Sequence, residues 1–175
     1  MWQDWNRRLA EENAKVQQAM IRWRIAQVIP KYFWSASIET LPGPLEKKIE
    51  ELPADKGLFL FGPVGCGKTY TLAAIARRQI EADIWPVELH NWERFLSNLR
   101  AVCGGKPGQA DRVILQTSKA AVLLFDDLSI AGSESEFSLK TLYSILDYRI
   151  EHGLPTFLSA NRTPDEIGKA YDQRI

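Results

Sequence analysis

Cysteine and histidine are scarce in this 175-residue sequence, which contains two of each. Cys66 and Cys103 form neither a disulfide framework nor the paired spacing of a zinc site. His90 and His152 have no partners at metal-binding spacing, so we assign them no role. The absence of a disulfide pattern favours a reducing environment, and we expect the protein to be cytoplasmic.

Long apolar runs and an excess of charge of either sign are also absent. No run approaches the roughly 18 apolar residues that a membrane span requires. Met1 leads directly into a polar and aromatic segment without the features of a signal peptide. The sequence has 22 basic and 22 acidic residues, hence a formal charge of zero. We therefore expect no membrane association, and any binding to nucleic acid must depend on local patches.

The composition that is present, 45% apolar and 25% charged residues, is typical of one globular domain. Apolar runs alternate along the chain with segments of helical periodicity. The runs predict strands at residues 57–61, 85–90, 121–127 and 155–161, and the periodic segments predict helices at 45–52, 70–82, 92–99, 137–152 and 164–171. This alternation predicts an α/β fold, a parallel sheet flanked by helices.

The first predicted strand is followed by a phosphate-binding loop. Residues 62–69 fit the pattern G-x-x-x-x-G-K-[ST], the Walker A motif, and a helix-compatible segment follows from Tyr70. A chance glycine-rich turn is the alternative, but strand, loop and helix occur in the order that phosphate binding requires. We therefore predict an ATP-binding protein.

The residue types of this loop suit a polyphosphate. Glycines allow several backbone N–H groups to approach the anion together, and the following helix directs its positive dipole end toward it. Lys68 adds a positive charge for the β- and γ-phosphates, and the Thr69 hydroxyl is a predicted ligand of Mg²⁺. The residues expected to bind ATP are Gly62, Pro63, Val64, Gly65, Cys66, Gly67, Lys68, Thr69 and Tyr70.

Two carboxylates end the third predicted strand. Five apolar residues, 121–125, precede Asp126 and Asp127, which is a Walker B pattern. Ligands bind at the carboxyl ends of strands in open α/β sheets. We expect Asp126 to bind Mg²⁺ and Asp127 to orient the water that attacks the γ-phosphate. The alternative is a pair of carboxylates that caps a strand end.

Asn161 ends the fourth predicted strand, at residues 155–161. An amide at this place can contact the γ-phosphate and the attacking water. Its alternative role is to begin the turn at Arg162-Thr163-Pro164. We predict a catalytic set of Asp127, Lys68 and Asn161.

The apolar periodicity of residues 1–29 predicts one long amphipathic helix. Residues 30–56 are expected to form a linker into a nucleotide-binding core at residues 57–175. The apolar members of the helical seam recur at steps of three and four, with Glu12 as the one polar member. They are Trp2, Trp5, Leu9, Val16, Ala19, Trp23 and Ala26. The seam either packs on its own domain or docks another protein, because tryptophan is a favoured interface anchor.

Basic residues surround a glycine-rich stretch at residues 103–108. They are Arg94, Arg100, Lys106, Arg112 and Lys119. Each is most simply a solvated surface residue, and the group is also the best local site for contacts with a nucleic-acid backbone.

The order of these motifs resembles the AAA+ ATPases, and within them the DnaC-type helicase loaders and the IstB-type transposition ATPases. The family run Leu-Tyr-x-Ile-x-x-x-Arg, followed by Leu-Pro-Thr and Thr-Ser-Asn, is matched by residues 142–149, 154–156 and 159–161. The resemblance implies an AAA+ core in which Asp126 and Asp127 are the Walker B pair and Asn161 is the sensor-1 residue. It also implies an extra helix within residues 92–119 that engages single-stranded DNA.

The sequence departs from this family at both ends. Family members carry a larger N-terminal domain for partner binding, so here we expect the helix of residues 1–29 to bind the partner. They also continue into a Ser-Arg-Leu element whose arginine reaches the neighbouring subunit's nucleotide, whereas Arg174 matches only the arginine before it. The chain therefore looks truncated, and we expect slow hydrolysis without a trans-acting arginine.

The resemblance implies an ATPase that assembles with ATP into a homo-oligomer on single-stranded DNA and delivers a replicative helicase during DNA replication. An IstB-like protein that assists a transposase on DNA would use the same core. A nucleotide-dependent adaptor with little turnover is a third hypothesis. A small-molecule kinase is disfavoured, because no arginine-rich lid segment follows the core.

Overall fold

The computed structural model describes residues 2–103, 108–129 and 135–167. Its elements, with η for short 3₁₀ helices, are α1 (Trp2–Val28), η1 (Lys31–Phe33), η2 (Ile38–Thr40), α2 (Gly43–Glu50), β1 (Leu58–Phe61), α3 (Lys68–Glu81), β2 (Val87–Asn91), α4 (Trp92–Cys103), α5 (Gln109–Ser118), β3 (Val122–Leu128), α6 (Ser135–Glu151) and β4 (Thr156–Ala160). Within these described ranges, no helix has the length and apolar character needed to cross a bilayer.

The four strands form one parallel sheet in the order β1-β4-β3-β2. The predicted parallel sheet is therefore confirmed. Phe157 of β4 lies between Leu58 of β1 and Leu124 of β3, so the central strands are apolar on both faces. Because the strands are parallel, their carboxyl ends share one edge of the sheet, and that edge receives the loops after β1, β3 and β4.

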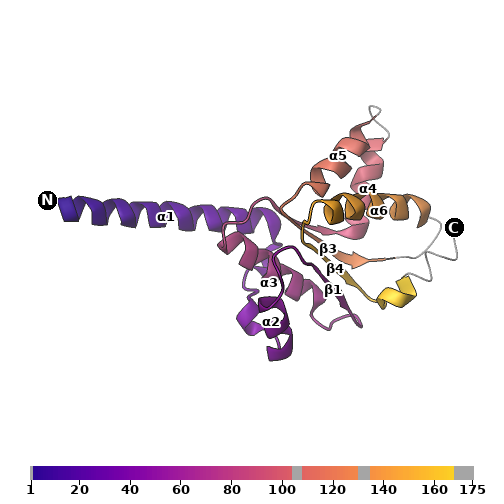
Figure 1. The fold of residues 1–175 in the computed structure, drawn as a ribbon, viewed down its shortest axis with the longest axis horizontal. Coiled ribbons are helices and arrows are strands. Elements are labelled where there is room, and N and C mark those ends of the chain that lie inside the picture. Colours follow the sequence, from indigo (N-terminus) through magenta and orange to yellow (C-terminus); the bar gives the residue numbers. More distant parts are fainter. Residues whose placement is uncertain (1, 104–107, 130–134, 168–175) are drawn as a thin grey trace.

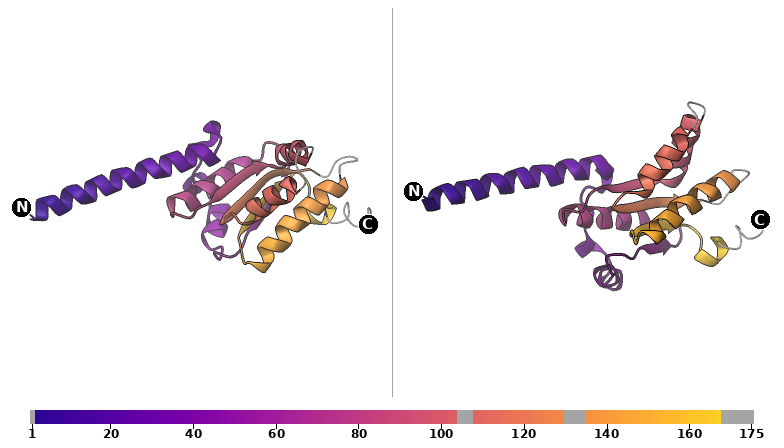
Figure 2. Two further views of the ribbon diagram at one scale, coloured as in Figure 1. Left: turned by 90° about the horizontal axis from the view of Figure 1, so that it is seen from above. Right: turned by 45° about the horizontal axis from the view of Figure 1, so that its top comes forward.

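Helices cover both faces of the sheet (Figure 1; Figure 2). On one face α3 packs through Leu72, Ile75 and Ile80, which are fully buried together with Val122 and Leu124 of β3. On the other face lie α4, α5 and α6, whose core side chains include Trp92 and Ile145. The apolar positions that predicted these helices are thus the ones that seal the two faces.

Helix α1 projects from this core (Figure 1). Its last two turns touch the domain, mainly through the partly buried Ile21, Ile25 and Val28. The predicted seam faces elsewhere: Trp23 is 56% exposed, and Trp2 is 79% exposed. The interpretation that the seam packs on its own domain is therefore wrong for the seam as a whole: three residues outside it make the main contact, and of the seam Trp23 lies beside Trp85 of the core.

The segment at 30–56, expected to be a linker, is packed against the α3 face. Ala36, Ile38, Leu41 and Ile49 are buried in the same apolar cluster as α3. The Trp34 indole N–H donates to the carbonyl of Ile29 at 2.8 Å. This segment therefore seats the end of α1 and brings η1 toward the loop after β1.

Several boundaries differ from the sequence-based ranges. Helix α3 begins at Lys68 and not at Tyr70, directly after Gly67 in the left-handed region at φ 94°. Helix α5 was implied by the family resemblance but not by our own periodicity assignment. Of the glycine-rich stretch, residues 104–107 lie outside the described residues, as do residues 168–171 of the last predicted helix.

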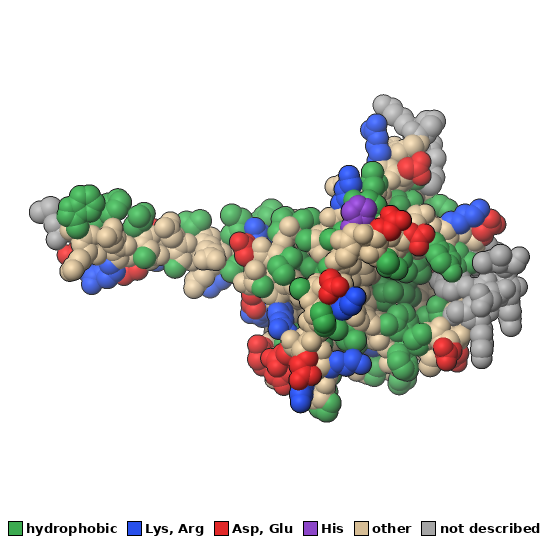
Figure 3. Space-filling model, viewed as in Figure 1, with side chains coloured by type: hydrophobic (Ala, Val, Ile, Leu, Met, Phe, Trp, Pro, Cys, Tyr) green, Lys and Arg blue, Asp and Glu red, His purple; other side chains and the backbone are tan. Residues whose placement is uncertain are grey.

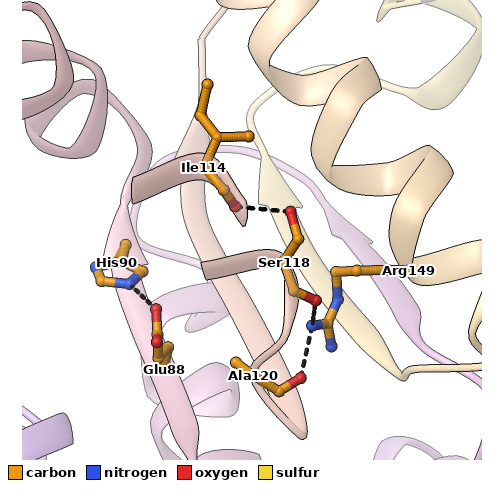
Figure 4. Close-up of polar contacts among 6 residues, drawn as sticks. All are labelled: Glu88, His90, Ile114, Ser118, Ala120 and Arg149. Atoms are coloured by element: carbon orange, nitrogen blue, oxygen red, sulfur yellow. Dashed lines mark hydrogen bonds and ion pairs between the residues drawn. The ribbon is translucent and has the colours of Figure 1, made fainter. Parts of the chain in front are cut away.

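Arg149 of α6 ties together the amino ends of β3 and β4, and Figure 4 shows its contacts with Ser118 and Ala120 before β3. Its side chain is fully buried and donates to the carbonyls of Ser118, Ala120 and Pro155 at 2.9, 2.7 and 2.6 Å, and to the Thr156 hydroxyl at 2.8 Å. Burial lowers the pKa of Arg149 to about 10, so the side chain stays cationic at neutral pH. The guanidinium thus satisfies the carbonyls of Ser118 and Ala120 and adds a second donor to the Pro155 carbonyl, which also accepts from the Leu123 N–H at 3.4 Å.

Candidate functional site

The loop between β1 and α3 has the backbone of a phosphate-binding loop. Gly65 and Gly67 have φ values of 84° and 94°, in the left-handed region that side chains rarely adopt. An added Cβ would meet no atom within 4 Å at either residue. Backbone conformation, and not crowding, therefore requires glycine at these two positions.

Lys68, the first residue of α3, lies over this loop. Its Nζ donates to the carbonyls of Gly62 and Pro63 at 2.8 and 2.9 Å. The same end of the helix carries unpaired backbone N–H groups and the positive end of the dipole. The Lys68 ammonium and the N-terminus of α3 thus make the surface beside the loop attractive to anions.

Thr69, Asp126 and Ser159 are joined by hydrogen bonds. The Thr69 hydroxyl donates to Asp126 Oδ2 at 2.8 Å, and the Ser159 hydroxyl donates to Asp126 Oδ1 at 2.6 Å. Ser159 is fully buried in β4. The carboxylate of Asp126 is therefore fixed from both sides, by α3 and by β4.

A β-bulge places Asp127 beside Asp126. Phe125 pairs with Leu158 and Leu128 with Ala160, so β3 contains one residue more than β4 between these pairs. Asp127 takes a left-handed conformation at φ 57°. Alternation along a regular strand would send successive side chains to opposite faces. The bulge instead lets both carboxylates reach the carboxyl edge of the sheet.

Two residues at the carboxyl end of β4, Ser159 within the strand and Asn161 just after it, hold Asp127 in place. Its backbone N–H donates to the Ser159 hydroxyl at 2.9 Å, and Asn161 Nδ2 donates to Asp127 Oδ1 at 3.0 Å. Ser159 therefore connects both carboxylate residues, to one through its proton and to the other through its oxygen. One continuous chain of polar contacts runs from Thr69 to Asn161.

These groups border one cleft of about 470 Å³. The lining residues are Tyr32, Phe33, Val64, Gly65, Gly67, Lys68, Thr69, Tyr70, Asn91, Asp126, Asp127 and Asn161. The structure thus brings together most of the residues selected from the sequence. Gly62, Pro63 and Cys66 belong to the loop but do not line the cleft.

Four contributors were missed from the sequence: Tyr32, Phe33, Asn91 and Ser159. Ser159 lies two residues before Asn161, and in a strand this spacing puts both side chains on one face, so a signal was present. Asn91 lies opposite Asp126 in the pairing of β2 with β3. The two aromatic residues come from η1, far from the motifs in sequence.

A second cavity of about 560 Å³ shares Thr69, Asn91 and Asp126 with the cleft and extends between β2, α4 and α5. His90 lines it, and His90 Nε2 lies 2.8 Å from Glu88 Oε2 (Figure 4). Of the predicted basic group, Arg94 lines this cavity, Arg100 lies 5.4 Å over the Phe137 ring, and Lys106 lies outside the described residues.

The residues present fit ATP and Mg²⁺. The cleft combines the left-handed glycines, a lysine and a helix N-terminus, which are donors suited to phosphate. The Thr69 hydroxyl and the Asp126 carboxylate offer the oxygen ligands that Mg²⁺ prefers. Among the described residues, no group of three or more His, Cys, Asp or Glu side chains is placed to hold a metal ion.

Comparison with known proteins agrees with this geometry. Residues 58–175 match the family model described as "ATPase family associated with various cellular activities (AAA)". The chain is 31% identical over 130 residues to the replicative helicase loader DnaI of Bacillus subtilis, which covers 73% of this chain and 41% of DnaI. It is 30% identical over 136 residues to the putative ATP-binding protein Rv3427c in insertion sequence of Mycobacterium tuberculosis, over 71% of this chain and 49% of that protein. The chain thus spans less than half of these curated relatives.

Solved structures show the same fold. A crystal structure of DnaI superposes with a TM-score of 0.67 at 24% identity, over 83% of this chain and 84% of that one. A crystal structure of the DnaC helicase loader gives a TM-score of 0.63 at 19% identity, over 82% of this chain and 87% of that one. Both identities are low, so these likenesses establish the shared architecture alone.

Proposed function

Because the chain belongs to the AAA family of ATPases, we propose that it binds and hydrolyses ATP in the cleft between the phosphate loop and the ends of β3 and β4. The observation that carries this proposal is the chain of hydrogen bonds from Thr69 through Asp126, Ser159 and Asp127 to Asn161. In this proposal Thr69 and Asp126 form the metal-binding side of the cleft, and Asp127 and Asn161 form its water-binding side.

In this proposal the loop backbone and Lys68 bind the phosphates. Thr69 and Asp126 would hold Mg²⁺, which neutralises charge on the β- and γ-phosphates when it is bound. Lys68 Nζ now bonds two loop carbonyls, and it would exchange them for phosphate oxygens. The exposed ring of Tyr32 borders the cleft and would contact the adenine base.

Asp127 would orient and polarise the attacking water, and Asn161 would position Asp127. The bulge aims the Asp127 carboxylate into the cleft, and the Asn161 amide fixes one of its two oxygens. The other oxygen stays available to accept a proton from water. Asn161 is thereby a positioning residue that can also reach the γ-phosphate.

We further propose that the protein acts as a DnaC-type helicase loader, in which ATP drives homo-oligomer assembly on single-stranded DNA. The name of the DnaI relative, replicative helicase loader, supports this role. A DnaA structure with a similar fold is described as bound to AMPPCP and single-stranded DNA. In this scheme residues 57–175 form the nucleotide-binding core and residues 1–29 dock the replicative helicase.

An IstB-like role is the second candidate, because the relative Rv3427c is described as an ATP-binding protein in an insertion sequence. The same core would then assist a transposase on DNA. Pull-down with the full chain, using a purified helicase and a purified transposase as competing baits, separates these two roles.

The test of the proposed function is ATP-dependent sedimentation of the chain with and without single-stranded DNA. We expect a large assembly only when ATP and DNA are both present, with slow phosphate release. Lys68→Ala is the control, because it removes the phosphate-binding charge from a half-buried position at the surface of the loop. A chain that binds ATP yet stays monomeric with DNA would contradict the loader role.

A further inference from the structure

The exposed seam of α1 follows a strict seven-residue repeat. Its positions 2, 5, 9, 12, 16, 19, 23 and 26 are separated by alternating steps of three and four residues, which are the a and d positions of a heptad. All eight are exposed, including Trp5 at 57% and Val16 at 63%. A repeat of seven, unlike a period of 3.6, keeps one face against a second helix along the whole length.

Apart from Trp23 at its carboxyl end, which lies beside Trp85, the seam faces away from the domain. Ile21, Ile25 and Val28, which seat α1 on the core, occupy the c and f positions of the same heptad, opposite a and d. In Figure 3 the hydrophobic side chains near the free end of α1 gather along one side, with charged side chains on the other. A partner can therefore cover the seam from Trp2 to Ala19 without disturbing the contact between α1 and the domain.

The apolar surface continues from α1 onto the core. The ring of Trp23 lies 6.3 Å from the ring of Trp85, which is itself 39% exposed and precedes β2. Arg24 lies 5.2 Å over Trp85 and bonds Asp83 at 2.5 Å, which fixes this end of the helix. A helix of about 27 residues is about 40 Å long, so the seam and Trp85 together form an extended docking strip.

Charge on the two sides of the seam is asymmetric. The g positions are Arg8, Lys15 and Arg22, and none of the three forms an ion pair with another described residue. The e positions are uncharged: Asn6, Asn13, Met20 and Gln27. Residues at e and g select the partner of a coiled coil through ion pairs, so this seam selects acidic flanking residues.

A second copy of α1 is a poor occupant. In a parallel pair the g row would face the uncharged e row, and the two Glu12 carboxylates would meet in one apolar layer. In an antiparallel pair the basic g rows of both helices would face each other. Neither arrangement offers ion pairs, and each contains a repulsive contact.

We propose that α1 is one half of a coiled coil whose other half is a partner helix with an apolar a/d seam, acidic flanking residues and a basic or amide residue opposite Glu12. This proposal rests on the proposed function, since α1 is the element assigned there to the helicase or transposase, and it names the chemistry by which that partner is recognised.

The experiment uses two synthetic helices of about 28 residues, four heptads. Both peptides carry leucine at the a and d positions, except for a lysine at the position opposite Glu12. One peptide has glutamate at all e and g positions, and the other has lysine at those positions. Titration calorimetry with the full chain should show the acidic peptide binding at least about tenfold more tightly, with the difference shrinking at high salt.

Three variants sharpen the test. Leu9→Asp should weaken binding at least about thirtyfold by placing a carboxylate in the seam. Ala14→Asp, the matched control on the opposite face, should bind as the parent does. The combined change Arg8→Glu, Lys15→Glu and Arg22→Glu should invert the preference between the two peptides.

Equal binding of both peptides, or full binding by Leu9→Asp, would overturn the proposal. So would dimerisation of the unmodified chain through the seam in sedimentation equilibrium, since the occupant would then be a second copy. Binding of a fluorescent ATP analogue is measured in the same samples. Failure of ATP binding with intact peptide selectivity would reject the proposed function and leave this inference standing.

Discussion

Strands β3 and β4 carry a polar network at each end, and the two networks are built differently. At the amino end, Arg149 is fully buried and all its described contacts go to neutral acceptors of the chain. At the carboxyl end, Asp127 is exposed, bulged and left-handed. The donors of Arg149 all bond acceptors inside the protein. The carboxylates of Asp126 and Asp127, in contrast, line a cleft that is open to solvent.

The difference shows that the amino ends of β3 and β4 carry contacts that stabilise the fold, whereas their carboxyl ends carry the residues of the candidate site. A buried network with every partner in place holds the strands together, and removing one member exposes unsatisfied carbonyls. A residue in a sparsely populated backbone region persists only where surrounding contacts fix it, and such residues cluster at functional sites. Ser159, buried between Asp126 and Asp127, supplies those contacts here.

The largest expected effect is on turnover. Asp127→Asn should lower the rate of phosphate release by about 100-fold or more, because an amide cannot accept the proton of the attacking water. Asparagine tolerates the left-handed region, so the bulge and the unfolding midpoint should be retained. ATP affinity measured by a fluorescent analogue should change less than about threefold. An equal loss of ATP affinity would contradict the assignment of Asp127 to catalysis.

At the opposite end, Arg149→Met should lower the free energy of unfolding by about 3 kcal/mol or more, because the buried carbonyls of Ser118 and Ala120 lose their donor. Urea denaturation measures this change. Lys140→Met, on the exposed face of the same helix, is the matched control and should change stability by less than about 0.5 kcal/mol. ATP affinity of folded Arg149→Met should stay near the parent value, and a selective loss of affinity would break the separation between the two ends.

Lys68→Ala should weaken ATP binding by about 100-fold, since one charge-assisted contact to phosphate contributes a few kcal/mol. Unfolding should be nearly unaffected, because the described contacts of the Nζ are all with the phosphate loop: the carbonyls of Gly62 and Pro63 and the Cys66 sulfur. Equilibrium titration with the fluorescent analogue provides the measurement. Retained binding would place the phosphates elsewhere than in this loop.

The smallest effect falls on the residue that connects the two carboxylates. Ser159→Ala removes one donor to Asp126 and one acceptor for the Asp127 N–H, and we expect turnover to fall about tenfold. The Mg²⁺ concentration for half-maximal rate should rise, which a purely structural role would not produce. Ser159→Thr keeps the hydroxyl and should restore both values; failure of this rescue would argue against positioning by the hydroxyl.

Sequence patterns predicted the parts of the fold and site that are local. The phosphate loop is eight consecutive residues, and the Asp126–Asp127 pair directly follows an apolar run, so both could be found without knowing any pairing. The bulge could not, because it depends on the register of β3 against β4, about 30 residues later. Tyr32 and Phe33 reach the cleft only through the packing of residues 30–56 against α3.

Helix α1 and Arg149 show the same limit in another form. The heptad period predicted a seam, but the main contact with the domain is made by Ile21, Ile25 and Val28, which lie outside the a and d positions of that repeat. Arg149 stands at the end of an apolar helix face, and sequence alone gives no sign that an arginine is fully buried. In both places tertiary packing decided which side of a helix is covered.

The strand order β1-β4-β3-β2 also determines the order in which the strands can pair during synthesis. β1 ends at residue 61 and its described partner β4 begins at residue 156, so β1 leaves the ribosome long before its neighbour exists. Such non-local pairing forms late and leaves an apolar strand open to chaperones or misassembly. The polar network of the cleft is therefore complete only after β4 has been synthesised and paired, because Ser159 lies in β4 and Asn161 follows it.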